Sequence, residues 1–451
     1  MRNSPLSRRQ FLRFSAGVAG LAALSACAPA AAPSAGGDAN GGAAASGEAV
    51  NVSLGLTWEA AFQSHQKEFD DKFMEAHPDI TLEPVYNTWS DHNNVVPTWA
   101  AADTLPDIIY VHGSRAFPWA FEGITIPLQS YIDTDTEFNV EDVWAEALNL
   151  YNFKGEQHGI PYDHGPNLLG YNKDMFDAAG IAYPDETWTM DTLRETALQL
   201  TDAAGEVPKW GWSAEMPGLS NQDGVSSLGP WGAELLNTDE NTLLLDTDAA
   251  LESTQYWTDL ILVDKSAPTP AESQAFEQGP WIAGQVGMAV VPSWETPSLA
   301  SFSTFAWDVA PWPEGPVARA TGSFGSGFSM TKNTQHPDQD WAYLREYLSK
   351  EGMEFMWGSS GRGSPARKSA YDSWMNSDTV PEHVHYYLDA LDTYAITGRP
   401  YQTLAAAELN DIITRSVTLL KSGEIDVASA LAAIMEEGAP VLTAAYERLN
   451  S

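Results

Sequence analysis

The chain has 451 residues, of which 43% are hydrophobic and 11% aromatic. It therefore carries enough apolar side chains to fold and is longer than a single hydrophobic core usually grows. Its formal net charge of −38 repels nucleic acids and anionic lipids, which argues against both as binding partners. The one cysteine, Cys27, excludes an intramolecular disulfide and a zinc site built from cysteines.

The first residues are typical of an export signal. Arg8 and Arg9 precede a short apolar segment, residues 15–24, which is too short to span a membrane as a stable helix. This order resembles a twin-arginine signal. We therefore expect residues 1–26 to form a signal peptide. The alternative is a hydrophobic N-terminus with no targeting role.

Cys27 comes directly after this segment. The sequence Leu24-Ser25-Ala26-Cys27 resembles a bacterial lipobox, in which the cysteine becomes the new, diacylated N-terminus. We therefore expect Cys27 to be a lipid anchor and not a catalytic thiol. Residues 27–49 are rich in Ala, Gly, Ser and Pro. Such a segment cannot form a core, so it is predicted to be a flexible linker.

The folded body begins with a pattern of alternating strands and helices. Phe62, Phe69 and Phe73 recur at helical spacing, and His77-Pro78 ends that helix. An alanine-rich helix is expected around residues 99–102. The predicted strands are residues 50–56, 80–85 and 106–111. Strand, helix, strand, helix, strand indicates an α/β fold with a parallel sheet.

Another informative stretch is residues 159–176. Its apolar run, Asn167–Tyr171, is bounded by turn-forming residues, which predicts a buried strand that leads into a helix. Just before it, Asp163 and His164 place a carboxylate and an imidazole beside a buried strand. Such groups need partners, either from the protein or from a bound ligand, so both are candidate ligand-binding residues. The alternative is an ordinary polar surface loop.

Further helices are predicted toward the C-terminus. Apolar residues at near-helical spacing predict amphipathic helices at residues 340–357 and 409–420. Gly423 supplies a stop signal for the second of them. A third helix is expected to begin in residues 427–435.

Short motifs occur along the chain in the order known from one family. The most diagnostic is Gly159-Ile160-Pro161 followed by Leu169-Gly170-Tyr171-Asn172-Lys173-Asp174-Met175-Phe176. The others are, in chain order, Trp58, His77-Pro78-Asp79-Ile80, Leu105-Pro106-Asp107-Ile108-Ile109, Gly123-Ile124-Thr125-Ile126-Pro127-Leu128, Ala179-Gly180-Ile181, Thr187-Trp188-Thr189, Phe276-Glu277-Gln278-Gly279, Gly287-Met288-Ala289 and Gly322-Ser323-Phe324-Gly325-Ser326-Gly327-Phe328. With these motifs, about residues 50–440 resemble the extracellular solute-binding proteins of carbohydrate ABC transporters, in the maltose-binding-protein-like group.

The resemblance implies an α/β fold of two lobes joined by a hinge, with an extra helical part at the C-terminus. By analogy, one lobe holds residues 50–162 and 313–356. The other lobe holds residues 163–312 and 357–451. The ligand is then expected in the cleft between the two lobes.

A sugar has two apolar faces and a rim of hydroxyls, so its binding needs aromatic plates and hydrogen-bonding side chains. Trp58 and Glu59 follow the first strand, and Tyr110 and His112 lie at the end of the third. Ligands bind at these strand ends in open α/β sheets. The alternative for Trp58 is a place in the core. The resemblance adds Arg115, which aligns with a sugar-contacting arginine, although Ser114 stands where the family has an aspartate.

Candidates also come from the second half of the chain. The resemblance places an aromatic platform of the second lobe at Trp294, beside Glu295. Trp231 is an alternative platform. Phe324 and Arg362 lie in glycine-rich turns and are expected to line the site, unless those glycines serve only tight turns.

No metal or cofactor is expected. Asp133, Asp135 and Glu137 alternate like the start of a calcium loop, but Phe138 stands where that loop needs glycine. The sequence contains no G-x-S-x-G motif, no phosphate-binding loop and no cysteine nucleophile.

The sequence therefore predicts a lipid-anchored, extracytoplasmic and monomeric substrate-binding protein of an ABC importer. It would capture a sugar or oligosaccharide by hinge closure and pass it to the permease subunits without chemistry. The alternative is a secreted carbohydrate-active enzyme, a glycosidase or lyase, because Asp163 and Glu295 could meet as its pair of carboxylates. A purely structural surface lipoprotein is a third possibility.

Overall fold

The computed structural model describes residues 49–451, except residues 59, 203–204, 206, 220, 238–240 and 399–401. The side chains of residues 60–61 and 221–222 are outside the description as well. The predicted signal peptide, nearly all of the predicted linker, the candidate lipidation site Cys27 and the candidate ligand-binding residue Glu59 therefore lie outside the described residues.

The first sheet contains the three strands predicted at the start of the body. Its strand order is β2–β1–β3–β14–β6. The strands are β1 Val50–Leu56, β2 Ile80–Tyr86, β3 Ile108–His112, β14 Ser326–Met330 and β6 Ile160–Pro161. β1 runs parallel to β2 and β3, as predicted, whereas β14 pairs antiparallel with both β3 and β6. The sheet is therefore mixed, because β14 runs opposite to its two neighbours, β3 and β6.

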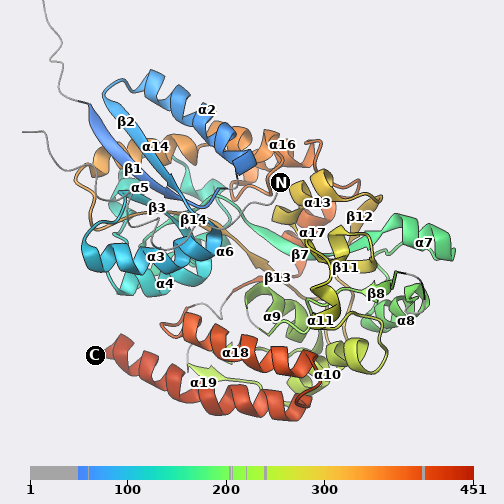
Figure 1. The fold of residues 1–451 in the computed structure, drawn as a ribbon. Helices are drawn as coiled ribbons and strands as arrows, with labels where there is room; N and C mark the ends of the chain where they lie inside the picture. Colours follow the sequence, from blue (N-terminus) through green and yellow to red (C-terminus); the bar gives the residue numbers. More distant parts are fainter. Residues whose placement is uncertain are drawn as a thin grey trace, which may run out of the picture. The chain divides into compact units, whose positions relative to one another are not determined.

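Helices cover both faces of this sheet, since side chains on a strand alternate between faces. On β3, Ile108 and Tyr110 pack in one cluster with Phe69 and Phe73, whereas Ile109 belongs to another. The helices are α2 Ala60–Ala76 and α14 Pro337–Tyr347 on the first face, and α3 Trp89–Ala102 and α4 Gly113–Phe121 on the second (Figure 1). Shorter helices on this side of the chain are α5 Gln129–Thr134, η1 Val140–Asp142 and α6 Ala145–Asn149. The predicted end of the first helix is confirmed, because α2 stops immediately before His77.

The second sheet is built around the buried strand predicted at residues 167–171. That strand is β7 Gly165–Asn172, and all eight of its residues are buried. The order of the sheet is β15–β13–β7–β11–β8, and β12 also pairs with β7. Its other strands are β8 Trp210–Trp212, β11 Val286–Pro292, β12 Trp307–Ala310, β13 Thr321–Phe324 and β15 Ala395–Thr397. Two small antiparallel pairs lie outside both sheets: β4 Asn152–Phe153 with β5 Glu156–Gln157, and β9 Leu236–Asn237 with β10 Thr242–Leu243.

Helices also surround the second sheet. They are α7 Lys173–Ala179, α8 Met190–Leu200, α9 Asn221–Leu228, η2 Gly229–Trp231, α10 Asp248–Leu262, α11 Pro270–Ser273, α12 Gly279–Ile282, η3 Ser293–Glu295, α13 Thr296–Phe302, α16 Tyr371–Met375 and α17 His385–Thr393. The short helix η5 Lys368–Ala370 packs through Ala370 in the core of the first sheet. Leu169 and Leu168, neighbours on β7, fall in two different core clusters. Both faces of the second sheet are therefore packed, which explains why β7 reads as a continuous apolar run.

The chain ends in a pair of helices that lie side by side (Figure 1). α18 is Ala406–Lys421 and α19 is Val427–Asn450. The predicted stop of the first is confirmed, since Gly423 adopts a φ of 74° after it. α19 is long and apolar enough to cross a membrane by length and composition. Its buried side chains nevertheless pack with α18 and α10 in one core cluster, as a helix of the folded body does.

The prediction of a single helix at residues 340–357 is wrong. α14 ends at Tyr347, and a new helix, α15 Lys350–Met353, follows. The break occurs because the Ser349 side chain accepts the Gly352 N–H and thereby caps a new helix start. The next residues, Glu354–Ser359 (η4), form a π-helix.

The chain passes between the two sheets at closely packed positions. It leaves β6 at Pro161 and enters β7 at Gly165, and it returns from β13 to β14 across Gly325. A side chain on Gly325 would collide with the backbone oxygen of Asp163, so these two crossings touch. β13 lies in the second sheet, although its residues fall in the segment 313–356 that the family resemblance gave to the first lobe. The lobe boundaries as a whole stay a prediction.

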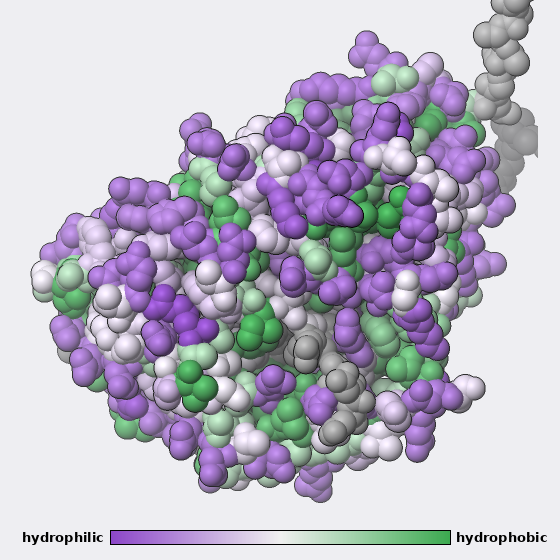
Figure 2. All heavy atoms as spheres, turned by 180° about the vertical axis from the view of Figure 1, so that it is seen from behind, coloured by the Kyte–Doolittle hydropathy of each residue, from purple (hydrophilic) through white to green (hydrophobic). Residues whose placement is uncertain are grey.

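The surface matches the acidic composition. On the face seen in Figure 2, hydrophilic side chains cover most of the area and hydrophobic ones are scattered between them. This distribution is expected for a chain with 61 acidic and 23 basic side chains.

Candidate functional site

A cavity of about 780 Å³ lies beside the crossings between the two sheets. Its walls come from both halves of the body. The first-sheet side contributes Thr57, Phe62, Trp89, Tyr110, His112 and Tyr162, and the second-sheet side contributes Trp294, Pro297, Ser298, Ser301, Phe302 and Phe324. The crossing segments, η4 and the residues just after η4 contribute Asp163, Gly325, Ser326, Trp357, Ser360 and Arg362. The volume is in the range of small-molecule sites.

The topology explains why the first-sheet residues meet there. β1, β2 and β3 are parallel, so their carboxyl ends lie at one edge of the sheet. Thr57 follows β1, Trp89 begins the helix after β2, and His112 ends β3. One wall of the cavity is therefore the carboxyl edge of the first sheet.

Three aromatic side chains in the cavity walls are unusually exposed for their size. Trp89 is 50% exposed, Trp294 38% and Phe302 58%. Large rings normally bury most of their surface, and a group of exposed ones in one hollow marks a binding surface. Trp89 comes from the first-sheet side. On the other side, Trp294 lies just before α13 and Phe302 is the last residue of α13. Aromatic faces are thus offered by both halves of the body.

Asp163 supplies a carboxyl group to the cavity at the crossing. Its Oδ1 accepts the Ser326 backbone N–H at 2.5 Å. Burial raises the pKa of Asp163 to about 7, although the bond from Ser326 and the nearby charge of Arg362 act in the opposite direction. At neutral pH this group can therefore both donate and accept hydrogen bonds.

His112 presents an imidazole that is neutral at physiological pH. Burial lowers its pKa to about 3, and the charge of Arg115 adds to the effect. The ring packs against Phe324 at 4.5 Å and edge-on against Trp89 at 5.5 Å between centroids. Its Nδ1 lies 2.8 Å from the Ser114 hydroxyl. The Ser114 hydroxyl thus helps to orient the His112 ring.

Arg362 lies among aromatic rings at the cavity wall. Its guanidinium carbon is 4.3 Å from the ring centroid of Trp58, 4.4 Å from that of Phe62 and 4.9 Å from that of Trp357. These distances are typical of cation–π contacts. Trp58 itself is only 2% exposed and is packed among aromatic neighbours.

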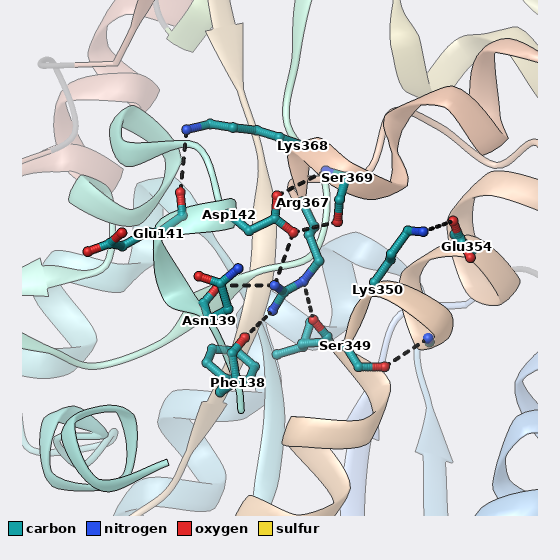
Figure 3. Close-up of polar contacts among 12 residues, drawn as sticks. Phe138, Asn139, Glu141, Asp142, Ser349, Lys350, Glu354, Arg367, Lys368 and Ser369 are labelled. Atoms are coloured by element: carbon teal, nitrogen blue, oxygen red, sulfur yellow. Dashed lines mark hydrogen bonds and ion pairs between the residues drawn. The ribbon is translucent and has the colours of Figure 1, made fainter. Parts of the chain in front are cut away.

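The segment that carries Arg362 is anchored by Arg367 (Figure 3). The buried guanidinium of Arg367 donates to the backbone oxygens of Leu348, Asn139 and Phe138 and pairs with Asp142 at 3.2 Å. Two separate segments, residues 138–142 and Leu348, are thereby tied to the residues just after the cavity wall.

A second anchor joins this segment to the first crossing and to the residue before Trp294. The Ser364 hydroxyl bonds to the His164 backbone oxygen and to the Ser293 hydroxyl, each at 2.7 Å. Gly165 lies against these two serines, and a side chain on it would collide with both hydroxyls. The wall that carries Trp294 is therefore packed directly on the lobe crossing.

Six of the predicted ligand-binding residues line the cavity: Tyr110, His112, Asp163, Trp294, Phe324 and Arg362. Trp58 does not line the cavity and contributes to it only by packing against Arg362. The other described candidates lie outside the walls of the cavity, each for its own structural reason.

His164 and Trp231 belong to the protein interior. His164 is buried, burial lowers its pKa to about 4, and its Nε2 lies 3.5 Å from the Thr397 hydroxyl. Trp231 packs against Tyr256 and Trp257 in the core of the second sheet. Both side chains therefore help to pack the interior and do not face the cavity.

Arg115 and Glu295 are partly buried beside the site. Arg115 lies on α4, which packs against α18, and burial lowers its pKa while Asp411 counteracts this. Burial raises the pKa of Glu295 to about 8, and the charge of Glu215 adds to the rise. A protonated Glu295 next to Trp294 can act as a hydrogen-bond donor.

Sequence reasoning missed several lining residues, above all Trp89 and Phe302. Trp89 follows the second strand just as Trp58 follows the first, so the strand-end argument would have found it. Phe302 and Trp357 lie at or near helix ends with no such signal.

Within the part of the chain that the structure describes, one cluster of potential metal ligands lies elsewhere, formed by Asp308, Glu382 and His383. Lys173 Nζ is 3.2 Å from Glu382 and 3.7 Å from Asp308. His383 Nδ1 also lies close to this cluster, 2.7 Å from the Asp308 carboxylate. The ammonium group already supplies the positive charge of this cluster.

Comparisons with known proteins agree with this architecture. Residues 57–354 match the family described as bacterial extracellular solute-binding protein, and residues 5–25 match the twin-arginine translocation pathway signal sequence. An arabinooligosaccharide-binding protein of Halalkalibacterium halodurans is 28% identical over 344 residues, covering 71% of this chain and 72% of that protein.

Solved structures show the same fold. The ABC substrate-binding protein Lmo0181 of Listeria monocytogenes in complex with cycloalternan superposes with a TM-score of 0.79 at 20% identity, covering 86% of this chain and 98% of that one. The cyclic alpha-maltosyl-1,6-maltose binding protein of Arthrobacter globiformis gives a TM-score of 0.72 at 22% identity, covering 87% and 99%. The predicted two-lobe α/β fold is thereby confirmed.

Proposed function

Because the chain belongs to the bacterial extracellular solute-binding protein family, a family of binding proteins and not of enzymes, we propose that it captures a sugar or short oligosaccharide for an ABC importer. The sugar binds in the 780 Å³ cavity and is released unchanged to the membrane permease subunits. The predicted alternative, a carbohydrate-active enzyme, is set aside by the family.

The observation that carries this proposal is the exposure of Trp89, Trp294 and Phe302 in the walls of one cavity. Flat aromatic faces cover the apolar C–H faces of a sugar ring. The carboxyl of Asp163, the guanidinium of Arg362 and the serine hydroxyls of the lining provide partners for the sugar's hydroxyls. Relatives that are an arabinooligosaccharide-binding protein and a lactose-binding protein support the same ligand class.

Capture follows from the position of the cavity between the two sheets. The lobes are proposed to close about the crossings at residues 162–164 and Gly325, which brings Trp294 toward Trp89. The ligand favours the closed form only by its better affinity for that form. Closure also removes water from the polar contacts, which strengthens them.

The chain belongs to an extracellular family and its residues 5–25 match a twin-arginine signal, so the mature protein acts outside the cytoplasm. We propose in addition that Cys27, at the end of a lipobox-like sequence, carries the lipid that holds a monomeric protein at the membrane. Residues 27–49 would then be the tether. Metabolic labelling with a fatty acid, compared between wild type and Cys27→Ala, tests this point.

Isothermal titration calorimetry tests the main proposal. The purified body is titrated with arabinotriose, maltotriose, mannotriose, lactose and tagatose, and the sugar is recovered afterwards for chromatography. We expect saturable binding of at least one sugar and its recovery at unchanged length. Shortened products would support an enzyme, and heat changes indistinguishable from buffer for all five sugars would contradict sugar capture.

A further inference from the structure

Arg362 is held in the cavity wall by the faces of aromatic rings. Its guanidinium carbon lies nearest to Trp58, at 4.3 Å from the ring centroid. Phe62 and Trp357 lie 4.4 and 4.9 Å from the same guanidinium carbon, and their rings stand at 85° and 75° to Trp58, so Trp58 forms one side of an aromatic enclosure. A shift of the Trp58 indole would therefore move one of the surfaces that hold the Arg362 guanidinium in its place.

The Trp58 indole is in turn fixed by a buried glutamine on α2. The Trp58 Nε1–H donates to Gln66 Oε1 at 2.6 Å, and Gln66 is fully buried. A buried indole N–H needs such an acceptor, since losing it leaves an unsatisfied donor. Gln66 thus sets the rotation of the ring on which Arg362 rests.

Gln66 itself cannot turn, because its amide is bonded on both sides. Its Nε2 donates to Asp70 at 2.7 Å and to the Tyr343 hydroxyl at 2.8 Å, and its Oε1 also accepts the Tyr347 hydroxyl at 3.1 Å. The Tyr343 hydroxyl donates to the same Asp70 oxygen. This chain of buried bonds runs from the interior of α2 and α14 to the wall of the cavity.

We propose that Gln66 is a positioning residue for the ligand site: through Trp58 it holds the Arg362 guanidinium at the place where it meets the bound solute. Trp58 then serves as the surface under Arg362 and not as a sugar platform. The inference rests on the proposed function, since it assigns a role within the same cavity.

The test is a double-mutant cycle in the complete mature protein. The affinities of wild type, Gln66→Met, Arg362→Met and the double variant are measured by calorimetry, with the tightest binder among the five named sugars as the probe. We expect Gln66→Met to weaken binding at least fivefold in the wild-type background. In the Arg362→Met background it should weaken binding less than twofold, because no guanidinium is left to position.

Gln157→Met is the matched control. Gln157 is also a buried glutamine with two hydrogen bonds, to the Leu148 and Gly159 backbone oxygens, and it does not line the cavity. It should lower the melting temperature, while its effect on affinity should stay within twofold and be the same in both backgrounds. A purely structural role of Gln66 would give this same pattern, so the cycle separates the two roles.

Unchanged affinity in Gln66→Met, or an equal loss in both backgrounds, would overturn the inference. If Gln66→Met does not fold, Trp58→Phe takes its place, because it keeps a ring and removes the indole N–H. Failure of the proposed function is a different result: wild type then binds none of the five sugars, and the inference falls with it.

Discussion

The Asp163 carboxylate accepts the backbone N–H of Ser326 at 2.5 Å, so one hydrogen bond joins the two crossings between the sheets at the wall of the cavity. This bond places an ionisable group at the point where closure of the lobes has to occur. Its protonation therefore concerns both the stability of the body and the binding of a ligand.

The first prediction concerns pH. Burial raises the pKa of Asp163 to about 7 from an ordinary value of 3.8, so between about pH 4 and 7 the folded chain binds more protons than the unfolded chain. Stability is then expected to fall as the pH rises through this window. Asp163→Asn keeps an oxygen for the Ser326 N–H and cannot ionise. It should raise the free energy of unfolding at pH 8 on the order of 1 kcal/mol, since the cavity partly solvates the group.

Denaturant unfolding of wild type and Asp163→Asn at pH 5 and pH 8 measures this difference. The two proteins should be closest in stability at pH 5. Some pH dependence should remain in the variant, because burial also raises the pKa of Glu295 to about 8. A variant less stable than wild type at pH 8 would show that the charged carboxylate is favourable in the fold.

The second prediction concerns the exposed ring of Trp294. Trp294→Ala should weaken sugar binding at least tenfold, because a stacking face is lost. The melting temperature of the free protein should hardly change, since 38% of this side chain is exposed. Tyr446→Ala is the control: that ring is 49% exposed on α19, does not line the cavity and should leave affinity unchanged. Equal affinity in Trp294→Ala would remove this residue from the binding site.

The third prediction concerns Gly165 at the lobe crossing. A methyl group there would collide with the hydroxyls of Ser293 and Ser364, so Gly165→Ala should cost about 1–3 kcal/mol of stability. Because Ser293 precedes Trp294, affinity for the sugar should fall as well. Adding Ser293→Gly removes one collision and should recover part of the stability in denaturant unfolding. If Gly165→Ala melts like wild type, the packing described at this crossing is not the native one.

The fourth prediction concerns Arg367, the anchor shown in Figure 3. Arg367→Met leaves the buried backbone oxygens of Leu348 and Phe138, the Asn139 backbone oxygen and the Asp142 carboxylate without their donor, and should lower the free energy of unfolding by about 3 kcal/mol. Lys368→Met is the control, because it removes an exposed charge of the same sign from the next residue. It should change the free energy of unfolding by less than about 0.5 kcal/mol in the same denaturant measurement. Similar losses in both variants would contradict the anchoring role.

The order of elements could be predicted from the sequence because local signals are strong there. The strands at residues 50–56, 80–85 and 106–111 are apolar runs, and His77-Pro78 and Gly423 stop helices by backbone chemistry alone. The break after Tyr347 was missed, since the apolar spacing continues across it while the Ser349 cap starts a new helix. The spacing of apolar residues indicates which face of a helix is buried, but it does not indicate where the backbone turns.

The sequence likewise determined which residues stand at strand ends. This argument correctly predicted that Tyr110 and His112 lie at the cavity. Only the tertiary structure decided which neighbouring side chains face the cavity. Trp58 turns into a core of aromatic rings and Trp89 stays exposed, although each follows a parallel strand. The reason is that the direction of each ring depends on partners in other elements, Gln66 of α2 and Arg362 for Trp58, and Tyr110 of β3 for Trp89. No local pattern carries that information.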